Sequence, residues 1–278
     1  MTNNNGKSIL ILGKPSSSKT VFLAQLIAIA NKQNSKVSFW KKPDIDAHLR
    51  AAIERIRNGQ NPEPTQADSS FKVDLPIKFN EENHEILCPD YGGEQINDIV
   101  KFKELTAEWQ TLVEKSNHWI LFIRLNSIEK NFDVTTKSPK EMSKNPSGAR
   151  VDYRISDEAV FIELLQILNY AKLASSQDTD SPKIVIALTC YDELNVKKMT
   201  PSEVFEDSLP LFSQFLFCNW KPERVRIIGV SALGLDLSNK ENAKKYVDEG
   251  HDKFPFVVAQ DSQEKVYDLT QVIHETLS

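Results

Sequence analysis

The sequence predicts an α/β fold of three layers, in which a mostly parallel central sheet carries helices on both faces. Strand-like apolar runs and helical runs alternate along almost the whole chain, as they do where helices connect parallel strands. In addition, the apolar run at residues 8–12 leads through a turn of small residues directly into an apolar helix at residues 21–30. We expect one domain over residues 1–278, with a helical insertion at about residues 41–60 and a polar surface insertion at about residues 126–156.

The predicted elements follow one another with readable boundaries. Residues 36–40 form a short strand or an extended link, and apolar side chains at helical spacing predict a helix at residues 44–58. Thr200 and Glu203 form a capping box that begins another helix. Further strands are predicted at residues 71–79, 85–88, 119–123, 183–188 and 225–230. Further helices are predicted at residues 96–114, 156–174 and 263–277.

The composition indicates a globular chain with no general affinity for nucleic acid. The 278 residues are 40% hydrophobic and 26% charged, which is ordinary for a protein that buries a core. The net charge of -5 argues against binding nucleic acid through a basic surface. Cys88, Cys190 and Cys218 are too few and too scattered for a disulfide framework or a zinc site. With no membrane-length apolar stretch and no signal-peptide layout, we expect a cytoplasmic protein.

The segment from Gly13 to Thr20 reads GKPSSSKT, and its position between a strand and a helix is the context of a nucleotide-binding P-loop. Its backbone N–H groups would surround phosphate oxygens, and the following helix would add its positive N-terminal dipole. Lys19 would reach the outer phosphates, and the Thr20 hydroxyl would bind Mg²⁺. Ser18 stands where the pattern has a glycine, which raises the steric cost of the backbone there. A serine-rich turn between a buried strand and a helix is the alternative interpretation.

Three further elements follow later strands in the order that nucleotide recognition requires. Asp90 and Gly93 fit the pattern D-x-x-G, in which the carboxylate holds Mg²⁺ through a water and the glycine N–H meets the terminal phosphate. The pattern TCYD, ending at Asp192, stands where a guanine-reading [N/T]-K-x-D element belongs, with Cys190 in place of the lysine. Its carboxylate can accept hydrogen bonds from the guanine ring N–H and amino group, whereas adenine offers no matching pair of donors. After the next strand, residues 231–233 read SAL. This matches the S-A-[K/L] element, whose backbone N–H meets the guanine oxygen.

Taken together, these four elements resemble the Ras-like GTPase domain of the translation-factor-related (TRAFAC) P-loop class. The resemblance covers nearly the whole chain, from Ser8 to the final helix. The long helical stretch before the second strand and the sequence D-x-G-G-E are similar to bacterial GTPase domains of the double-GTPase type, found in conflict or defence loci. The resemblance implies a P-loop NTPase fold, GTP or GDP with Mg²⁺ as ligands, and a protein partner in a complex.

The resemblance also assigns roles to individual residues. Thr20 would bind Mg²⁺ directly and Asp90 through a water, and Thr65 would be the switch hydroxyl. Lys19, Thr65 and Glu94 would form the catalytic group, with Glu94 at the place where many members carry a glutamine that orients the attacking water. The residues that would bind the nucleotide are Gly13, Lys14, Ser16, Ser17, Ser18, Lys19, Thr20, Gly93, Thr189, Asp192, Ser231, Ala232 and Leu233.

Some of these roles have alternatives. Glu94 is equally well explained as a solvated charge at a helix N-terminus, and Thr65 as a solvated loop residue. Arg50, Arg55 and Arg57 could supply a cation to the phosphates, but a basic solvated helix face explains them better.

The leading functional hypothesis is a Mg²⁺-dependent GTPase that acts as a conformational switch for a protein partner. Ser18, Cys190 and Glu94 all favour a second hypothesis, a pseudo-GTPase that serves as a scaffold in a larger complex. A third hypothesis, an ATP-using enzyme, is disfavoured by residues 189–192.

Overall fold

The computed structural model describes residues 6–30, 32, 35–63, 72–89, 94–128, 155–175, 180–196 and 198–278. Within these residues, nine strands form one sheet in the order β2-β3-β4-β1-β5-β6-β7-β8-β9. The strands are β1 (Ser8–Gly13), β2 (Val37–Phe39), β3 (Val73–Phe79), β4 (Glu82–Cys88), β5 (His118–Ile123), β6 (Lys183–Thr189), β7 (Val225–Ser231), β8 (Phe256–Val258) and β9 (Lys265–Val266).

The middle of the sheet is parallel and both of its edges are antiparallel. Strands β4, β1, β5, β6 and β7 run in the same direction, and β1 is paired on both sides, with Leu10 opposite Leu87 and Trp119. Strands β2 and β3 continue one side, and β8 and β9 the other, in antiparallel pairs. The parallel strands are nearly continuous apolar runs because both of their faces are buried. Their carboxyl ends therefore lie along one edge, where the candidate loops emerge.

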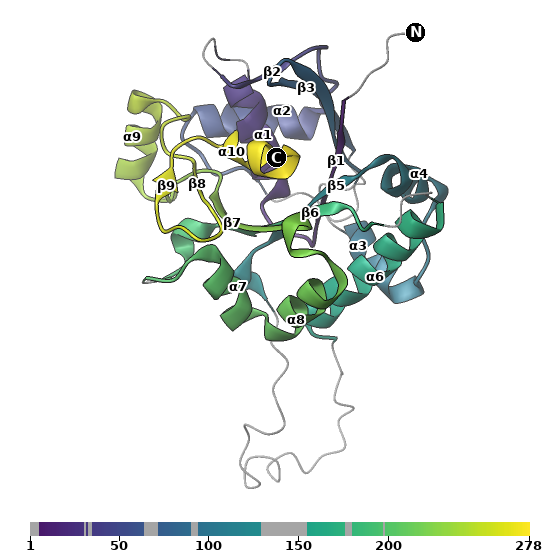
Figure 1. Cartoon of the computed structure of the whole chain (residues 1–278). Coiled ribbons are helices and arrows are strands. Elements are labelled where there is room, and N and C mark those ends of the chain that lie inside the picture. The colour runs from purple at the N-terminus through teal and green to yellow at the C-terminus, as the bar shows by residue number, and fades with distance from the viewer. Residues whose placement is uncertain are drawn as a thin grey trace, which may run out of the picture.

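Helices cover both faces of the sheet, as the sequence predicts (Figure 1). One hydrophobic core joins one face of the sheet to α1, α2 and α10, and a second core joins the opposite face to α3, α4, α6, α7 and α8. The described helices are α1 (Lys19–Ala30), α2 (Ala47–Arg57), α3 (Glu94–Phe102), α4 (Ala107–Lys115), α6 (Asp157–Ser175), α7 (Pro201–Ser208), α8 (Pro210–Asn219), α9 (Lys240–Glu249) and α10 (Gln271–Leu277). No helix in this described part of the chain is both long enough and apolar enough to cross a bilayer.

Local side-chain contacts set several of the helix ends. The carboxylate of Asp46 accepts a hydrogen bond from the Leu49 N–H at 2.7 Å, so α2 begins at Ala47 rather than at residue 44. The predicted capping box at Thr200 and Glu203 is present, because each side chain accepts a hydrogen bond from the other residue's backbone N–H.

The prediction of one helix at residues 96–114 is wrong. Helix α3 ends at Phe102, Lys103 has a left-handed φ of 58°, and the Thr106 hydroxyl caps α4 by accepting a hydrogen bond from the Trp109 N–H at 3.3 Å. The prediction of a final helix from residue 263 is also wrong, because residues 265–266 form β9 and α10 begins at Gln271. Strand β8 and helix α9 were not predicted at all. Of the polar insertion at residues 126–156, residues 129–154 lie outside the described residues.

Candidate functional site

The loop from Gly13 to Thr20 joins the carboxyl end of β1 to the first turn of α1. Lys19 is 2% exposed, and its ammonium donates hydrogen bonds to the carbonyl oxygens of Gly13 at 2.6 Å and Lys14 at 2.8 Å. A third contact reaches Ser17 Oγ at 3.3 Å. These bonds close the loop into a compact ring around the lysine, with backbone N–H groups at the start of a 12-residue helix.

The backbone of this loop takes conformations that favour glycine. Ser16 and Ser18 have left-handed φ angles of 61° and 66°, which an L-residue with a side chain adopts at a cost. The sequence predicts this cost at Ser18 but not at Ser16. At Gly13 a Cβ atom would lie 2.6 Å from Ser17 Oγ and 2.8 Å from the Phe122 carbonyl oxygen, so no larger residue fits without a shift of the backbone.

Two more predicted loops meet at the ends of β6 and β7. Strand β6 ends at Thr189, Cys190 follows with a left-handed φ of 50°, and residues 191–193 form a short 3₁₀ turn. Asp192 accepts a hydrogen bond from the Ser231 hydroxyl, which itself accepts one from the Gly234 N–H at 2.9 Å. Through this bond the structure brings residues 189–192 and 231–233 together.

The turn at residues 191–193 packs against a glycine of the neighbouring strand β7. The ring of Tyr191 packs over Gly229 of β7, where an added Cβ would approach ring atoms at 2.7 Å. Burial raises the pKa of the Tyr191 hydroxyl to about 12, so it stays protonated. Anchored in this way, the turn presents Asp192 as an exposed carboxylate.

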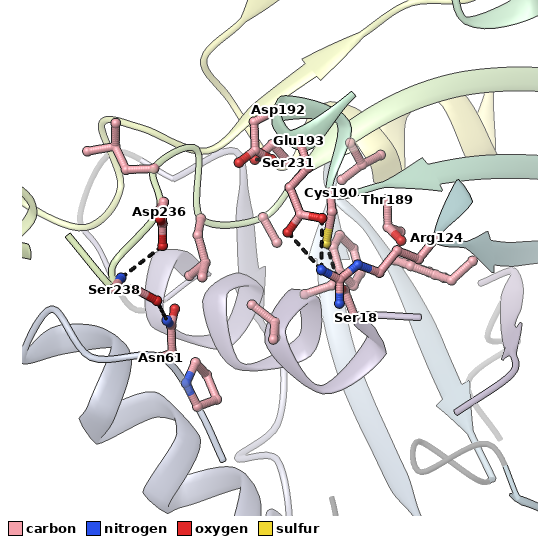
Figure 2. A pocket seen from close by; sticks show the side chains of 18 residues that line it. Ser18, Asn61, Arg124, Thr189, Cys190, Asp192, Glu193, Ser231, Asp236 and Ser238 are labelled. Carbon is pink, nitrogen blue, oxygen red and sulfur yellow. Dashed lines mark hydrogen bonds and ion pairs between the residues drawn. The ribbon is translucent and has the colours of Figure 1, made fainter. Parts of the chain in front are cut away.

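A cavity of about 550 Å³ lies between these loops (Figure 2). Six of the predicted site residues line it: Ser18, Thr189, Asp192, Ser231, Ala232 and Leu233. Thr189 is 2% exposed, and its hydroxyl has no hydrogen-bond partner among the described residues. A buried donor left in this way can be satisfied by a ligand. The other lining residues are Val21, Phe22, Asn61, Pro62, Phe122, Arg124, Cys190, Glu193, Val230, Leu235, Asp236 and Ser238.

A second cavity, of about 270 Å³, lies beside the same loop. Lys14, Ser16 and Ser17 line it, and Lys14 forms an ion pair there with Asp157, which is 4% exposed at the first turn of α6. This ion pair joins the loop at residues 13–20 to α6, which packs in the second hydrophobic core. This ion pair could not be predicted from the sequence, because the two residues are 143 positions apart.

The two residues that depart from the expected patterns touch each other. Ser18 Oγ and Cys190 Sγ are 3.1 Å apart, although Ser18 replaces a glycine in one loop and Cys190 a lysine in another. Burial is the main reason why the pKa of the Cys190 thiol is raised, so the thiol stays neutral at physiological pH. The loops at residues 13–20 and 189–192 are therefore in direct contact at this point.

Arg124 and Glu193 belong to the cavity wall but were missed in the sequence. The Arg124 Nη2 atom donates to both carboxylate oxygens of Glu193 at 2.8 Å. This contact is the main cause that raises the pKa of the arginine. The available signal was a charged residue directly after the apolar strand β5, which is the position where ligand-binding groups gather in parallel sheets.

Several predicted residues lie elsewhere or cannot be placed. Thr65, Asp90 and Gly93 lie outside the described residues. Glu94 is the first residue of α3, a position that suits a carboxylate with or without a catalytic role. Arg55 contacts the loop that follows its own helix, through Glu63 Oε1 at 2.9 Å and the Asn61 carbonyl at 2.9 Å.

Comparison with known proteins places this chain in a family. No curated protein matches it. Among solved structures, the nucleolar GTP-binding protein 1 of Plasmodium falciparum is similar, with a TM-score of 0.41 and 16% identity over 89% of this chain and 87% of that chain. The sequence profile of the Double-GTPase 1 family matches residues 10–276. Since that match spans almost the whole sequence, the chain belongs to the Double-GTPase 1 family.

Proposed function

We propose that this protein binds GTP and GDP with Mg²⁺, and that it hydrolyses GTP to GDP and phosphate as a switch for a protein partner. Membership of the Double-GTPase 1 family supports a guanine nucleotide as the ligand. The observation that carries the proposal is the hydrogen bond from Ser231 to Asp192. It holds both candidate guanine-reading loops beside the cavity that Ser18 of the phosphate loop also lines. We propose that a single domain carries this whole site.

On the phosphate side, Lys19 would exchange its bonds to loop carbonyls for bonds to the β- and γ-phosphate oxygens. Alternating left-handed and right-handed backbone turns direct successive N–H groups to one side and form an anion-binding concavity. The left-handed residues Ser16 and Ser18 are at the positions where such turns would occur. The start of α1 would add its partial positive charge.

For Mg²⁺, the described residues offer the hydroxyl of Thr20, the second residue of α1, which is 8% exposed. A hydroxyl oxygen is a hard ligand of the kind that Mg²⁺ prefers, so Thr20 fits the assigned role. Asp90 and Thr65 would complete the protein's contribution. Held there, Mg²⁺ would supply positive charge against the phosphate oxygens. No cluster of three or more His, Cys, Asp or Glu that could hold a metal ion occurs in the described ranges, and Asp90 and Thr65 lie outside them.

On the base side, the exposed carboxylate of Asp192 would accept hydrogen bonds from the guanine N–H and amino groups. The Ser231 hydroxyl would hold this carboxylate in place, because it already donates to it. The backbone N–H of Ala232 would donate to the guanine oxygen. Adenine lacks these complementary groups, so selectivity for guanine would follow.

In hydrolysis, Gly93 would donate its N–H to the γ-phosphate and Glu94 would accept a hydrogen bond from the attacking water. A carboxylate cannot also donate as an amide does, so we expect a slow intrinsic rate. Loss of the γ-phosphate would release the segments that carry Thr65 and Gly93, and the partner would sense that change.

One observation favours the second hypothesis, in which the protein is a scaffold that does not hydrolyse GTP. Ser18 and Cys190, which stand where the nucleotide-binding patterns have a glycine and a lysine, contact each other at 3.1 Å. The two hypotheses differ in a measurable way, because a scaffold would show no phosphate release.

The test is a titration of the full chain with fluorescent mant-GTP and mant-ATP in the presence of Mg²⁺, followed by a phosphate-release assay. We expect binding of mant-GTP but not of mant-ATP. The variant Lys19→Ala should lose affinity for the nucleotide without unfolding. Asp192→Asn should lower the affinity for GTP by about tenfold or more, since an amide presents a donor to the guanine N–H groups.

The matched control is Asp248→Asn on α9, which should bind as the wild type does. Absence of mant-GTP binding by the wild type would contradict the proposal. Binding without any phosphate release, with or without a partner, would leave the scaffold hypothesis in place of the enzyme.

A further inference from the structure

We propose that Arg124, held in position by Glu193, contacts the nucleoside half of the bound guanine nucleotide. Its guanidinium would supply the cation that the lysine of an [N/T]-K-x-D element would otherwise supply at the position of Cys190. This inference rests on the proposed function, because it names a further residue that binds the same ligand.

The position of Arg124 follows from the sheet order. It comes directly after Ile123, the last residue of β5, and β5 lies between β1 and β6. The side chain therefore emerges between the phosphate loop, which follows β1, and the turn at residues 191–193, which follows β6. Figure 2 shows Arg124 together with Ser18 and Cys190 in one part of the cavity.

Glu193 holds the guanidinium without using all of its donors. One nitrogen, Nη2, makes both contacts to the carboxylate, at 2.8 Å each. A guanidinium has five N–H donors, and Arg124 Nε has no hydrogen-bond partner among the described residues. The Asn126 side chain also donates to Glu193, at 3.4 Å. The carboxylate is thus fixed from two sides, and the arginine is oriented with donors to spare.

The charges of the residues that line the cavity indicate a role for Arg124 in binding the ligand. Among the described residues that line it, Arg124 is the single cation, against the carboxylates of Asp192, Glu193 and Asp236. The thiol of Cys190 stays neutral and adds no charge. With three carboxylates and one guanidinium, the described lining is net negative, and Arg124 is the one positive group that a ligand can meet there. A guanidinium also stacks well on aromatic faces such as a purine ring.

Cys190 makes room for this arrangement. A lysine at that position would bring a second cation on a long side chain toward the same space, whereas the cysteine ends at a sulfur 3.1 Å from Ser18 Oγ. The short side chain and the arginine on the neighbouring strand are therefore complementary. The positive charge would therefore come from the residue that follows β5 instead of the residue that follows β6.

The test compares dissociation constants of mant-GTP and mant-GDP for the wild type and Arg124→Met. Methionine keeps an unbranched stem but removes the charge and the donors. We expect affinity to fall about tenfold for both nucleotides, because the contact is to a part of the nucleotide that GTP and GDP share. A loss for mant-GTP alone would overturn the placement, since it would mean a contact to the γ-phosphate.

Arg224→Met is the matched control. Arg224 also pairs with one carboxylate, Asp180, at 3.0 Å, and its side chain is 29% exposed against 34% for Arg124. It precedes β7, at the end of that strand remote from the cavity, so the variant should bind both nucleotides as the wild type does. Thermal unfolding of both variants should show that each is folded.

A double-mutant cycle with Glu193→Gln tests the positioning role. We expect Glu193→Gln to weaken binding less than Arg124→Met does, and the double variant to bind no more weakly than Arg124→Met alone. Additive losses would overturn the claim that Glu193 acts through Arg124. If the wild type binds and Arg124→Met binds equally well, the inference fails alone. If the wild type binds no guanine nucleotide, the proposed function fails with it.

Discussion

At the scale of single residues, backbone conformations that disfavour side chains gather at the candidate site. Six non-glycine residues in the described part of the chain have positive φ, and three of them are Ser16, Ser18 and Cys190. Such conformations cost free energy and persist where the surrounding structure fixes them. Their concentration at two loops that face one cavity suggests that the shape of these loops is maintained for a ligand.

The first prediction concerns Ser18, whose φ is 66°. The substitution Ser18→Gly should raise the free energy of unfolding by about 1 kcal/mol, because glycine adopts this conformation without the steric cost of a Cβ. Urea unfolding of the purified protein, followed by circular dichroism, measures the change.

Ser18→Ala is the control, since it keeps the strained backbone but removes the hydroxyl that contacts Cys190. It should be no more stable than the wild type. If the alanine variant gained as much as the glycine variant, the contact with Cys190 rather than the backbone would be the source of the cost.

The sequence identifies candidate site residues where a short pattern contains the whole signal. The loops at residues 13–20 and 231–233 and the carboxylate of Asp192 could be predicted in this way. Arg124 and Glu193 could not, because they are 69 positions apart and meet only through the pairing of β5 with β6. No spacing rule links two residues that are joined by the order of strands in a sheet.

At the scale of elements, the break between α3 and α4 shows the limit of periodicity. Ile99 and Val100 on one side, and Trp109 and Val113 on the other, are buried in the same core. The apolar pattern therefore continues across the break and predicts one helix. The break itself depends on the left-handed backbone conformation of Lys103. No sequence pattern indicates that conformation.

Capping by Thr106 gives the second prediction. Thr106→Ala should lower the free energy of unfolding by about 1 kcal/mol, because the Trp109 N–H loses its acceptor at the start of α4. Thermal or urea unfolding measures the change.

Thr111 on the same helix provides the comparison. Its hydroxyl only donates to the carbonyl of Ala107, one turn earlier, and alanine is the better helix former. Thr111→Ala should therefore leave stability unchanged or increase it. If the free energy of unfolding fell equally in both variants, the loss would come from replacing a threonine and not from removing the cap.

Most of the parallel strands could be predicted because they are long apolar runs. Strands β8 and β9 could not, since they have three and two residues and owe their existence to pairing with β7 and with each other. Helix α9 buries only Tyr246 among its described residues and is strongly polar, so its sequence offers few apolar residues by which to recognise it.

At the scale of the whole molecule, a buried histidine links stability to pH. His118, the first residue of β5, is 6% exposed, and neither ring nitrogen has a hydrogen-bond partner among the described residues. Burial, with smaller effects from the charges of Lys7, Lys183, His84 and Arg224, lowers the pKa of His118 to about 4. The folded protein therefore keeps this ring neutral in conditions where the unfolded chain protonates it.

The third prediction follows from the sign of that shift. Between pH 6.5 and pH 4 the unfolded chain binds one proton more at this position, so the free energy of unfolding should fall as the pH is lowered. From pH 7 to pH 5 this residue alone should account for about 2 kcal/mol. Urea unfolding at a series of pH values measures the slope.

His118→Gln has no titrating group at this position. Its stability should depend on pH less steeply than that of the wild type over the same range. Parallel slopes for the two proteins would mean that other groups, such as the buried His84 and the partly buried His251, carry the dependence.

The two edge strands of the sheet are very short, because β2 has three residues and β9 has two. Few backbone groups are left there for another chain to pair with, and this is a known protection against uncontrolled assembly. A partner protein would gain little by adding a strand of its own. A partner that binds this molecule is therefore expected to contact side chains on its helices and loops rather than the edges of the sheet.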